Sequence, residues 1–96
     1  MIEIRLTPAF TRWLADLADR AAHQRIIARL RRIELGNPGD VAPVGEGVSE
    51  LRIDYGPGYR LYFVQRGRKM IVMLCGGNKK TQRRDIAMAK SMAREI

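Results

Sequence analysis

The side chains that could do chemistry in this sequence are mainly cations. Nine of the 18 lysines and arginines lie between Arg52 and Arg84, and this stretch contains one acid, Asp54. The segments before and after it each hold equal numbers of basic and acidic residues, so the formal net charge of +8 lies within about a third of the chain. Such clustering predicts a polyanionic partner, which could be nucleic acid, an acidic protein or an anionic membrane face.

Most of the usual catalytic signatures are absent. The sequence has one cysteine, Cys75, and one histidine, His23, so neither a disulfide nor a zinc site can form within the chain. No phosphate-loop or dinucleotide-binding glycine pattern occurs. We expect Cys75 to lie in the core and His23 at a helix junction, and we expect neither a metal nor a cofactor.

The cationic residues suit one reaction on RNA that needs no metal. The 2′-hydroxyl attacks the adjacent phosphate and the 5′-oxygen leaves, which requires a base, an acid and cations near the transition state. Arg60 could hold the phosphate with two hydrogen bonds, and Tyr62 could stack on a base or donate its hydroxyl. Lys79, crowded by Lys80, could act as the base. The same residues equally suit plain binding of nucleic acid.

The start of the last predicted helix adds to these cations. A helix start presents free backbone N–H groups that suit a phosphate, but it disfavours each lysine or arginine by roughly 0.3–1 kcal/mol. Four cations lie there nevertheless, which we interpret as a functional feature. They are Lys79, Lys80, Arg83 and Arg84.

The first part of the chain predicts a strand followed by two helices. Residues 2–6 alternate apolar and charged side chains, as in a short strand with one solvent-exposed face. Thr7 and Pro8 suit the N-cap and first position of a helix over 8–21. A second apolar stripe predicts a helix over 23–35. Because almost no linker separates the two helices, we expect an antiparallel hairpin.

The second part of the chain predicts a loop, three strands and a final helix. Residues 37–47 are rich in turn-forming residues and predict a surface loop. Gly76 and Gly77 are expected to end the last strand, and apolar spacing predicts a helix over 81–94. The strands are predicted over 48–54, 59–66 and 70–75.

These elements predict one domain, 1–96, of the α+β class. Their order is β-α-α-β-β-β-α, with a helical hairpin packed on a small, mainly antiparallel sheet and a C-terminal helix. Arg60 and Tyr62 share one predicted strand face, and Arg52 points the same way if the register allows. No apolar run approaches the roughly 18–20 residues of a membrane span, and the start lacks signal-peptide features. We therefore expect a cytoplasmic protein with no membrane partner.

Two longer segments resemble a known family: GEGVSELRIDYGPGYRLYF and MLCGGNKKTQRRDIAMAK. They are similar to the RelE/ParE superfamily of toxins from bacterial type II toxin–antitoxin systems, above all to the addiction module killer proteins related to HigB and phage Gp49-like proteins. The resemblance covers nearly the whole chain and implies a RelE-like α+β fold. For the RelE and HigB branches it implies ribosome-dependent cleavage of mRNA without a metal. It also implies a cognate antitoxin, a helix-turn-helix protein similar to HigA, bound in a hetero-oligomer.

The resemblance also ranks the candidate residues. Arg60 matches the arginine of the YR strand and comes first, and Arg52 of the LR element comes second. Lys79 and Gln82 match the lysine and glutamine of the GG-K-TQ motif, whereas Asn78 stands where relatives commonly carry Asp. The predicted catalytic residues are Arg60, Lys79, Arg52, Tyr62 and Gln82, and the predicted RNA- or phosphate-binding residues are Lys80, Arg83, Arg84, Arg66, Arg68 and Lys69.

The fold does not decide the activity. ParE members share it but inhibit DNA gyrase and cleave no RNA. We favour an mRNA endonuclease that acts on the ribosome and arrests translation and growth, because cationic and hydroxyl groups converge on one predicted sheet face. A gyrase inhibitor and a non-catalytic nucleic-acid-binding module are the alternatives.

Overall fold

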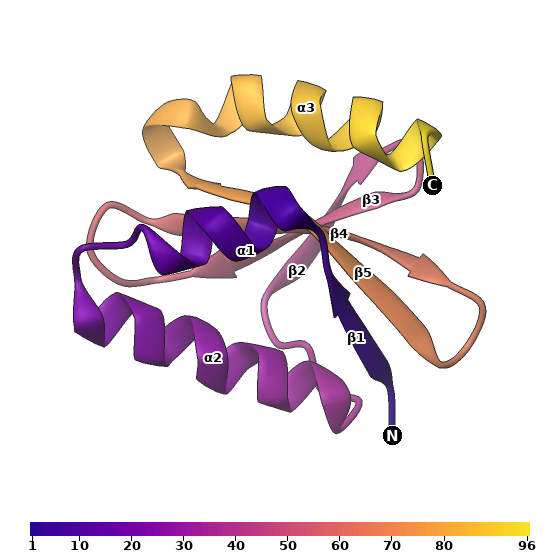
Figure 1. Cartoon of the computed structure of the whole chain (residues 1–96), viewed down its shortest axis with the longest axis horizontal. Coiled ribbons are helices and arrows are strands. Elements are labelled where there is room, and N and C mark those ends of the chain that lie inside the picture. Colours follow the sequence, from indigo (N-terminus) through magenta and orange to yellow (C-terminus); the bar gives the residue numbers. More distant parts are fainter.

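Alternating apolar residues build a five-stranded sheet with helices on both faces (Figure 1). The computed structural model describes all of residues 1–96. The strands, in the spatial order β1-β5-β4-β3-β2, are β1 (Glu3–Leu6), β2 (Val41–Gly45), β3 (Val48–Ile53), β4 (Tyr59–Arg66) and β5 (Met70–Asn78). The helices are α1 (Pro8–Ala15), α2 (Arg20–Glu34) and α3 (Gln82–Arg94), and the short 3-10 helix η1 (Lys79–Thr81) precedes α3. Only β1 and β5 pair in parallel. The predicted α+β class is confirmed.

The two sheet faces carry separate hydrophobic cores. Leu61 and Phe63 of β4 belong to the larger core, which includes residues of α1 and α2, whereas Tyr62 belongs to the smaller core under α3. The residues that α3 buries there are Ala89 and Ala93. The helical hairpin therefore covers one face, as predicted, and α3 covers part of the other (Figure 1). No helix has both the length and the apolar character that crossing a membrane requires.

Asp19 accounts for the main difference between the predicted and observed helices. Its Oδ1 accepts hydrogen bonds from the backbone N–H groups of Ala21 (2.9 Å) and Ala22 (3.2 Å), so α2 begins at Arg20 rather than at residue 23. The first helix ends at Ala15, well before residue 21. The predicted boundaries were wrong because the apolar spacing continues across this N-cap.

The segment 37–47, predicted as a loop, contains the edge strand β2. This strand pairs with β3 through a turn in which Glu46 and Gly47 both have positive φ. Pro43 lies within the strand, which an edge position tolerates because no further strand needs its missing N–H group. The residues that suggested a loop therefore form a short strand with an irregular register between Pro43 and Gly45.

The strand β5 continues through Gly76 and Gly77, so the prediction that they end it was wrong. Each glycine lies where another side chain fills the space of a Cβ. The Trp13 ring lies against Gly76, and the side chains of Asp85 and Thr81 lie against Gly77. These close approaches allow α1 and the start of α3 to pack directly on the backbone of β5.

We expect Gly76→Ala to destabilise the fold by about 2 kcal/mol or more, because the added methyl group overlaps the Trp13 ring and overpacking is costly. Chemical denaturation followed by the fluorescence of the single tryptophan measures this. Gly67→Asn is the control, since nothing lies within 4 Å of a Cβ there and asparagine tolerates the φ of +67°. Equal stabilities of the two variants would contradict the tight packing.

Candidate functional site

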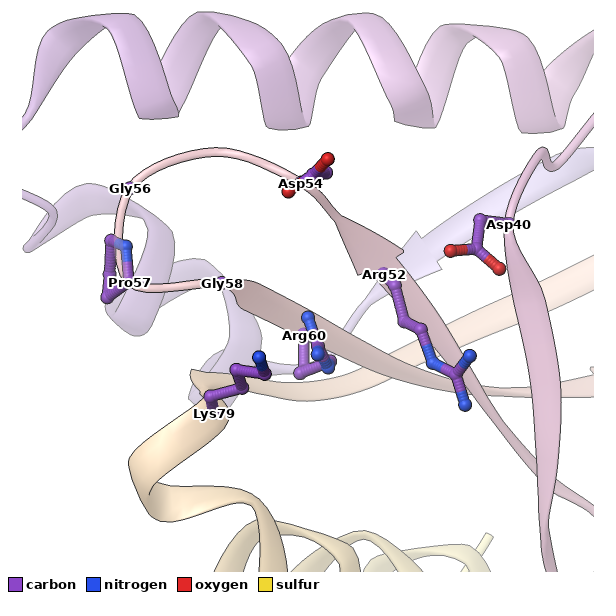
Figure 2. Close-up of a pocket in the computed structure, with 8 residues that line it drawn as sticks. All are labelled: Asp40, Arg52, Asp54, Gly56, Pro57, Gly58, Arg60 and Lys79. Carbon is purple, nitrogen blue, oxygen red and sulfur yellow. The ribbon is translucent and has the colours of Figure 1, made fainter.

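A polar cleft of about 370 Å³ opens beside the β3–β4 turn and η1 (Figure 2). The pairing of β3 with β4 places Arg52 directly opposite Arg60. Lys79 enters the cleft from η1, and Asp54 lies at its other side (Figure 2). No hydrophobic residue contributes to the lining, which consists of Asp40, Arg52, Asp54, Gly56, Pro57, Gly58, Arg60 and Lys79.

Arg60 lies in the cleft with hydrogen-bonding capacity to spare. The residue is only 9% exposed. Its Nη1 donates to the carbonyl of Tyr59 at 3.2 Å, whereas its buried Nε has no hydrogen-bond partner. An unpartnered buried donor is unfavourable and needs an explanation. The Glu50 carboxylate, whose Oε1 lies 3.9 Å from this Nε, offsets part of the cost by its charge, and the Nη2 group of Arg60, which has no protein partner, remains for an anionic ligand in the cleft.

Behind the cleft, a buried carboxylate lies close to both arginines that line it. Glu50 is 1% exposed and lies on β3, two residues before Arg52. Its Oε1 accepts a hydrogen bond from Arg52 Nε at 3.1 Å and lies 3.9 Å from Arg60 Nε. Its Oε2 accepts hydrogen bonds from the Tyr62 hydroxyl at 3.1 Å and from Gln82 Nε2 at 2.6 Å. Sequence reasoning missed Glu50, because a charged residue on a polar strand face suggests exposure to solvent.

The surroundings of Glu50 keep it ionised. Burial alone would raise the pKa of Glu50, but hydrogen bonds from Gln82, Arg52 and Tyr62 and the charge of Arg60 outweigh it, so the pKa lies below its usual range. Burial and the neighbouring Glu50 carboxylate raise the pKa of Tyr62 well above its ordinary value. The tyrosine therefore remains a neutral donor to a charged acceptor.

Two of the predicted catalytic residues lie behind the cleft rather than in it. Tyr62 is fully buried and donates to Glu50, so neither its ring nor its hydroxyl is open to an RNA strand. The predicted role of Tyr62 in stacking therefore does not fit the structure. Gln82, at the start of α3, also contacts Glu50 and does not line the cleft. The predicted catalytic residues that do line it are Arg52, Arg60 and Lys79.

Contrary to the prediction, the backbone at the start of the helix is not available to a phosphate. The Oδ1 atom of Asn78 accepts hydrogen bonds from the N–H groups of Lys80 (2.9 Å) and Thr81 (3.3 Å). The Thr81 hydroxyl accepts one from Asn78 N–H at 3.1 Å, which completes a capping box. The buried acid Asp85 in the first turn of α3 further offsets the positive end of the helix. Asn78 thus occupies the donors that a ligand would need.

The predicted RNA-binding residues near the β4–β5 turn are remote from the cleft. Arg66 donates from Nη2 to the carbonyl of Ala93 at 3.2 Å and so ties β4 to the end of α3. Arg68 and Lys69 lie in the turn itself, at the opposite end of the sheet from the β3–β4 turn (Figure 1). The length of β4 separates the two ends by roughly 20 Å. The structure therefore does not bring these three cations together with Arg60.

The other predicted RNA-binding cations lie around the start of α3. Lys80, Arg83 and Arg84 are all exposed. The Nε of Arg84 lies 3.6 Å from the Asp85 carboxylate, and Arg84 lines a different groove, together with residues of α1. Lys80 is next to Lys79 in η1 and is thus the nearest of the three in sequence to the cleft.

Hydrogen bonds to α2 fix the chain around the cleft. Arg29 donates from Nη1 to the carbonyl of Arg52 at 2.9 Å, at the end of β3. In the β3–β4 turn the hydroxyl of Tyr55 donates to Asp19 Oδ2 at 3.0 Å. Hydrogen bonds therefore tie this turn to α2 and its N-cap residue, so the lining residues of the turn do not belong to a free loop.

The cleft combines three cations with two carboxylates. Arg52, Arg60 and Lys79 can together hold an anion such as a phosphate. Asp40 and Asp54, which sequence reasoning did not select, can accept protons or hydrogen bonds. Asp40 was missed because it precedes a strand that was predicted as a loop, and no local pattern marks Asp54 as part of a site.

Comparisons with known proteins cover almost the whole chain, including the cleft residues. The chain matches the family model of phage-derived Gp49-like proteins over residues 12–94, which include every residue that lines the cleft. It is also similar to an uncharacterised protein of Haemophilus influenzae. The two are 43% identical over 95 residues, which cover 99% of this chain and 96% of the relative.

We expect Cys75 to resist thiol reagents in the native protein. Burial, with the nearby Asp85 charge, raises the pKa of its thiol to about 12, so at pH 8 roughly one thiol in ten thousand is ionised. A chromogenic disulfide reagent at pH 8 should react with the unfolded protein in guanidinium chloride but only negligibly with the folded protein. Fast stoichiometric labelling without denaturant would show that the thiol is accessible.

We expect Glu50 to contribute to acid denaturation. Because its folded pKa is lowered, the carboxylate stabilises the fold above the unfolded value of about 4.3 and this contribution is lost as the pH falls further. Unfolding free energies measured between pH 7 and pH 3 should therefore fall less steeply for Glu50→Gln than for the wild type. Glu46→Gln, at an exposed acid paired with Arg94, is the matched control. Parallel curves for wild type and Glu50→Gln would contradict this assignment.

Proposed function

The chain belongs to the family of phage-derived Gp49-like proteins, within the RelE/HigB-like group of addiction module killer toxins, and on this premise we propose that it cleaves mRNA. Membership of this family indicates the toxin of a toxin–antitoxin system and implies an antitoxin partner. We propose more specifically a metal-independent endoribonuclease that acts on the ribosome. Its antitoxin would be a helix-turn-helix protein similar to HigA, bound in a hetero-oligomer in the cytoplasm.

The observation that carries this proposal is the state of Arg60. Its side chain is almost completely buried, yet its Nη2 group has no protein partner, and the same cleft also presents Arg52 and Lys79. A phosphate bound between these side chains would accept hydrogen bonds from this Nη2 group and from the Nη groups of Arg52, which also lack a protein partner. The pentacoordinate transition state carries more negative charge than the bound diester, so fixed cations lower its energy more than that of the substrate.

The proposed step is a transfer within the RNA backbone. The 2′-oxygen forms a bond to phosphorus as its proton passes to a base, and the bond from phosphorus to the 5′-oxygen breaks as that oxygen gains a proton. The products are a 2′,3′-cyclic phosphate and a 5′-hydroxyl. Asp54, Asp40 and Lys79 are the groups in the cleft that can exchange these protons. Arg60 and Arg52 remain charged and stabilise the phosphate throughout.

The lack of aromatic rings in the cleft supports the proposal that the ribosome presents the substrate. Free RNA strands are usually held by bases stacked on aromatic side chains. Here Tyr62 and Tyr59 are buried, and the lining contains no aromatic residue. Contacts to phosphate alone would leave the bases unplaced. A second surface, such as the decoding site of a ribosome, would then have to hold them.

We expect Arg60→Ala to lower mRNA cleavage by at least about 100-fold, because the phosphate loses its buried charged donor. The change should also relieve growth arrest when the toxin is expressed without its antitoxin. Arg60→Lys should recover little of the activity, since an ammonium cannot replace the guanidinium fork.

Arg31→Ala is the control for this experiment, because this exposed arginine pairs with Glu34 on α2, away from the cleft. Circular dichroism and melting temperature establish that each variant is folded. A folded Arg60→Ala protein with undiminished toxicity would refute the assignment.

Brief expression separates cleavage from gyrase inhibition. An endonuclease stops translation at once and leaves mRNA cuts in register with codons. A gyrase inhibitor changes DNA supercoiling while translation initially continues. Binding of RNA with a steep salt dependence but without cuts would indicate a non-catalytic module instead.

A further inference from the structure

We propose that Glu50 is a positioning residue that aims the two arginines of the cleft at the substrate phosphate. This inference rests on the proposed function. Glu50 does not line the cleft and therefore would not touch RNA. It acts through Arg52 and Arg60, both of which present their Nε atoms to the same carboxylate oxygen.

The N–H groups of each guanidinium that face Glu50 are not available to a ligand, so only the remaining N–H groups can bind one. Arg52 uses only Nε, at 3.1 Å from Glu50 Oε1, so both of its Nη groups remain without a protein partner. Arg60 bonds through Nη1 to the carbonyl of Tyr59, so its Nη2 remains free. Glu50 thus holds Arg52 by a hydrogen bond and attracts the Nε edge of Arg60 by its charge from 3.9 Å, and both arginines keep outer N–H groups for the oxygens of a phosphate.

The carboxylate is itself held independently of the arginines. Its Oε2 accepts hydrogen bonds from Tyr62, on β4, and from Gln82, at the start of α3. With Oε2 anchored from two elements, Oε1 has a fixed place between the arginine side chains. This arrangement also gives Gln82 a role, since it supports the acceptor rather than touching the substrate.

Electrostatics makes the same residue necessary for the pairing of β3 with β4. Arg52 and Arg60 are directly opposite each other, an arrangement of like charges that destabilises a sheet. One buried negative charge between them offsets this repulsion and leaves the site cationic. Without it, the guanidinium groups would separate, even though the cleft as a whole would become more positive.

These two effects give Glu50→Gln an unusual expected signature. The neutral amide keeps the size of the side chain but removes its charge, so attraction of an anion to the cleft should not weaken. The orientation of Arg52 and Arg60 should be lost, and misplacement by about 1 Å typically lowers a rate up to about 100-fold. We therefore expect kcat to fall by about 10- to 100-fold while KM is unchanged or lower.

The test compares wild type, Glu50→Gln and Glu46→Gln in a cleavage assay on purified ribosome–mRNA complexes. Glu46→Gln makes the same chemical change at an exposed acid outside the cleft and should keep wild-type kcat and KM. Rates are divided by the folded fraction of each protein. A wild-type kcat per folded Glu50→Gln molecule would show that Glu50 is merely structural, and a rise in KM as the main effect would overturn the positioning role.

A second variant keeps the inference testable if Glu50→Gln does not fold. Gln82→Ala removes one anchor of Oε2 from a partly exposed position, and we expect a smaller fall in kcat, again without a rise in KM. A Gln82→Ala protein with wild-type kinetics would contradict the inference.

Failure of the proposed function is distinguishable from failure of this inference. If the wild type cuts no mRNA, the endonuclease proposal falls, and the side-chain Nε–H signals of Arg52 and Arg60 are followed by NMR during titration with inorganic phosphate. Glu50→Gln should shift and broaden both Nε–H signals while phosphate still binds. Unchanged Nε–H signals in the variant would overturn the positioning role.

Discussion

A buried negative charge between two facing arginines is the constraint on which the site depends. Neighbouring strands bring Arg52 and Arg60 together through their register, and Glu50 makes that register compatible with two positive charges. The carboxylate is held in turn by Tyr62 and Gln82, so β3, β4 and the start of α3 form one hydrogen-bonded unit. The geometry of the cleft therefore follows from the packing of α3 on the sheet as much as from the residues that line the cleft.

Much of the fold could be predicted from local pattern, and the errors have a common cause. Local pattern located four of the five strands, the α2 stripe and the last helix, because their apolar residues follow the spacing of a strand or a helix. The strand β2 and the glycines of β5 escaped prediction because their reasons lie elsewhere in the chain. Gly76 is explained by Trp13, and Gly77 by Asp85 and Thr81. Turn-forming residues look alike whether they end a strand or admit a neighbouring side chain.

The candidate site was predictable only as far as its motif residues. The predicted order of the strands and the resemblance to a known family together selected Arg60, Arg52 and Lys79, which line the cleft. Glu50 and Tyr62 lie on the same strand face as these arginines, and alternation alone does not distinguish a covered position from an exposed one. Their burial depends on where α3 packs on the sheet. A contact between segments so far apart in the chain cannot be predicted from a short window of sequence.

The side chains packed beside Gly76 and Gly77 give these glycines a structural role. A sequence motif that identifies the family therefore need not report its activity. The paired glycines belong to one of the two segments that resemble the family, yet the structure explains them by the space available: a ring lies over one and polar side chains lie against the other. Selection for a stable fold is enough to preserve such positions. If Arg60 has the role proposed for it, a descendant that had lost this arginine would still carry the signature, and a genome survey based on the signature would count inactive copies as toxins.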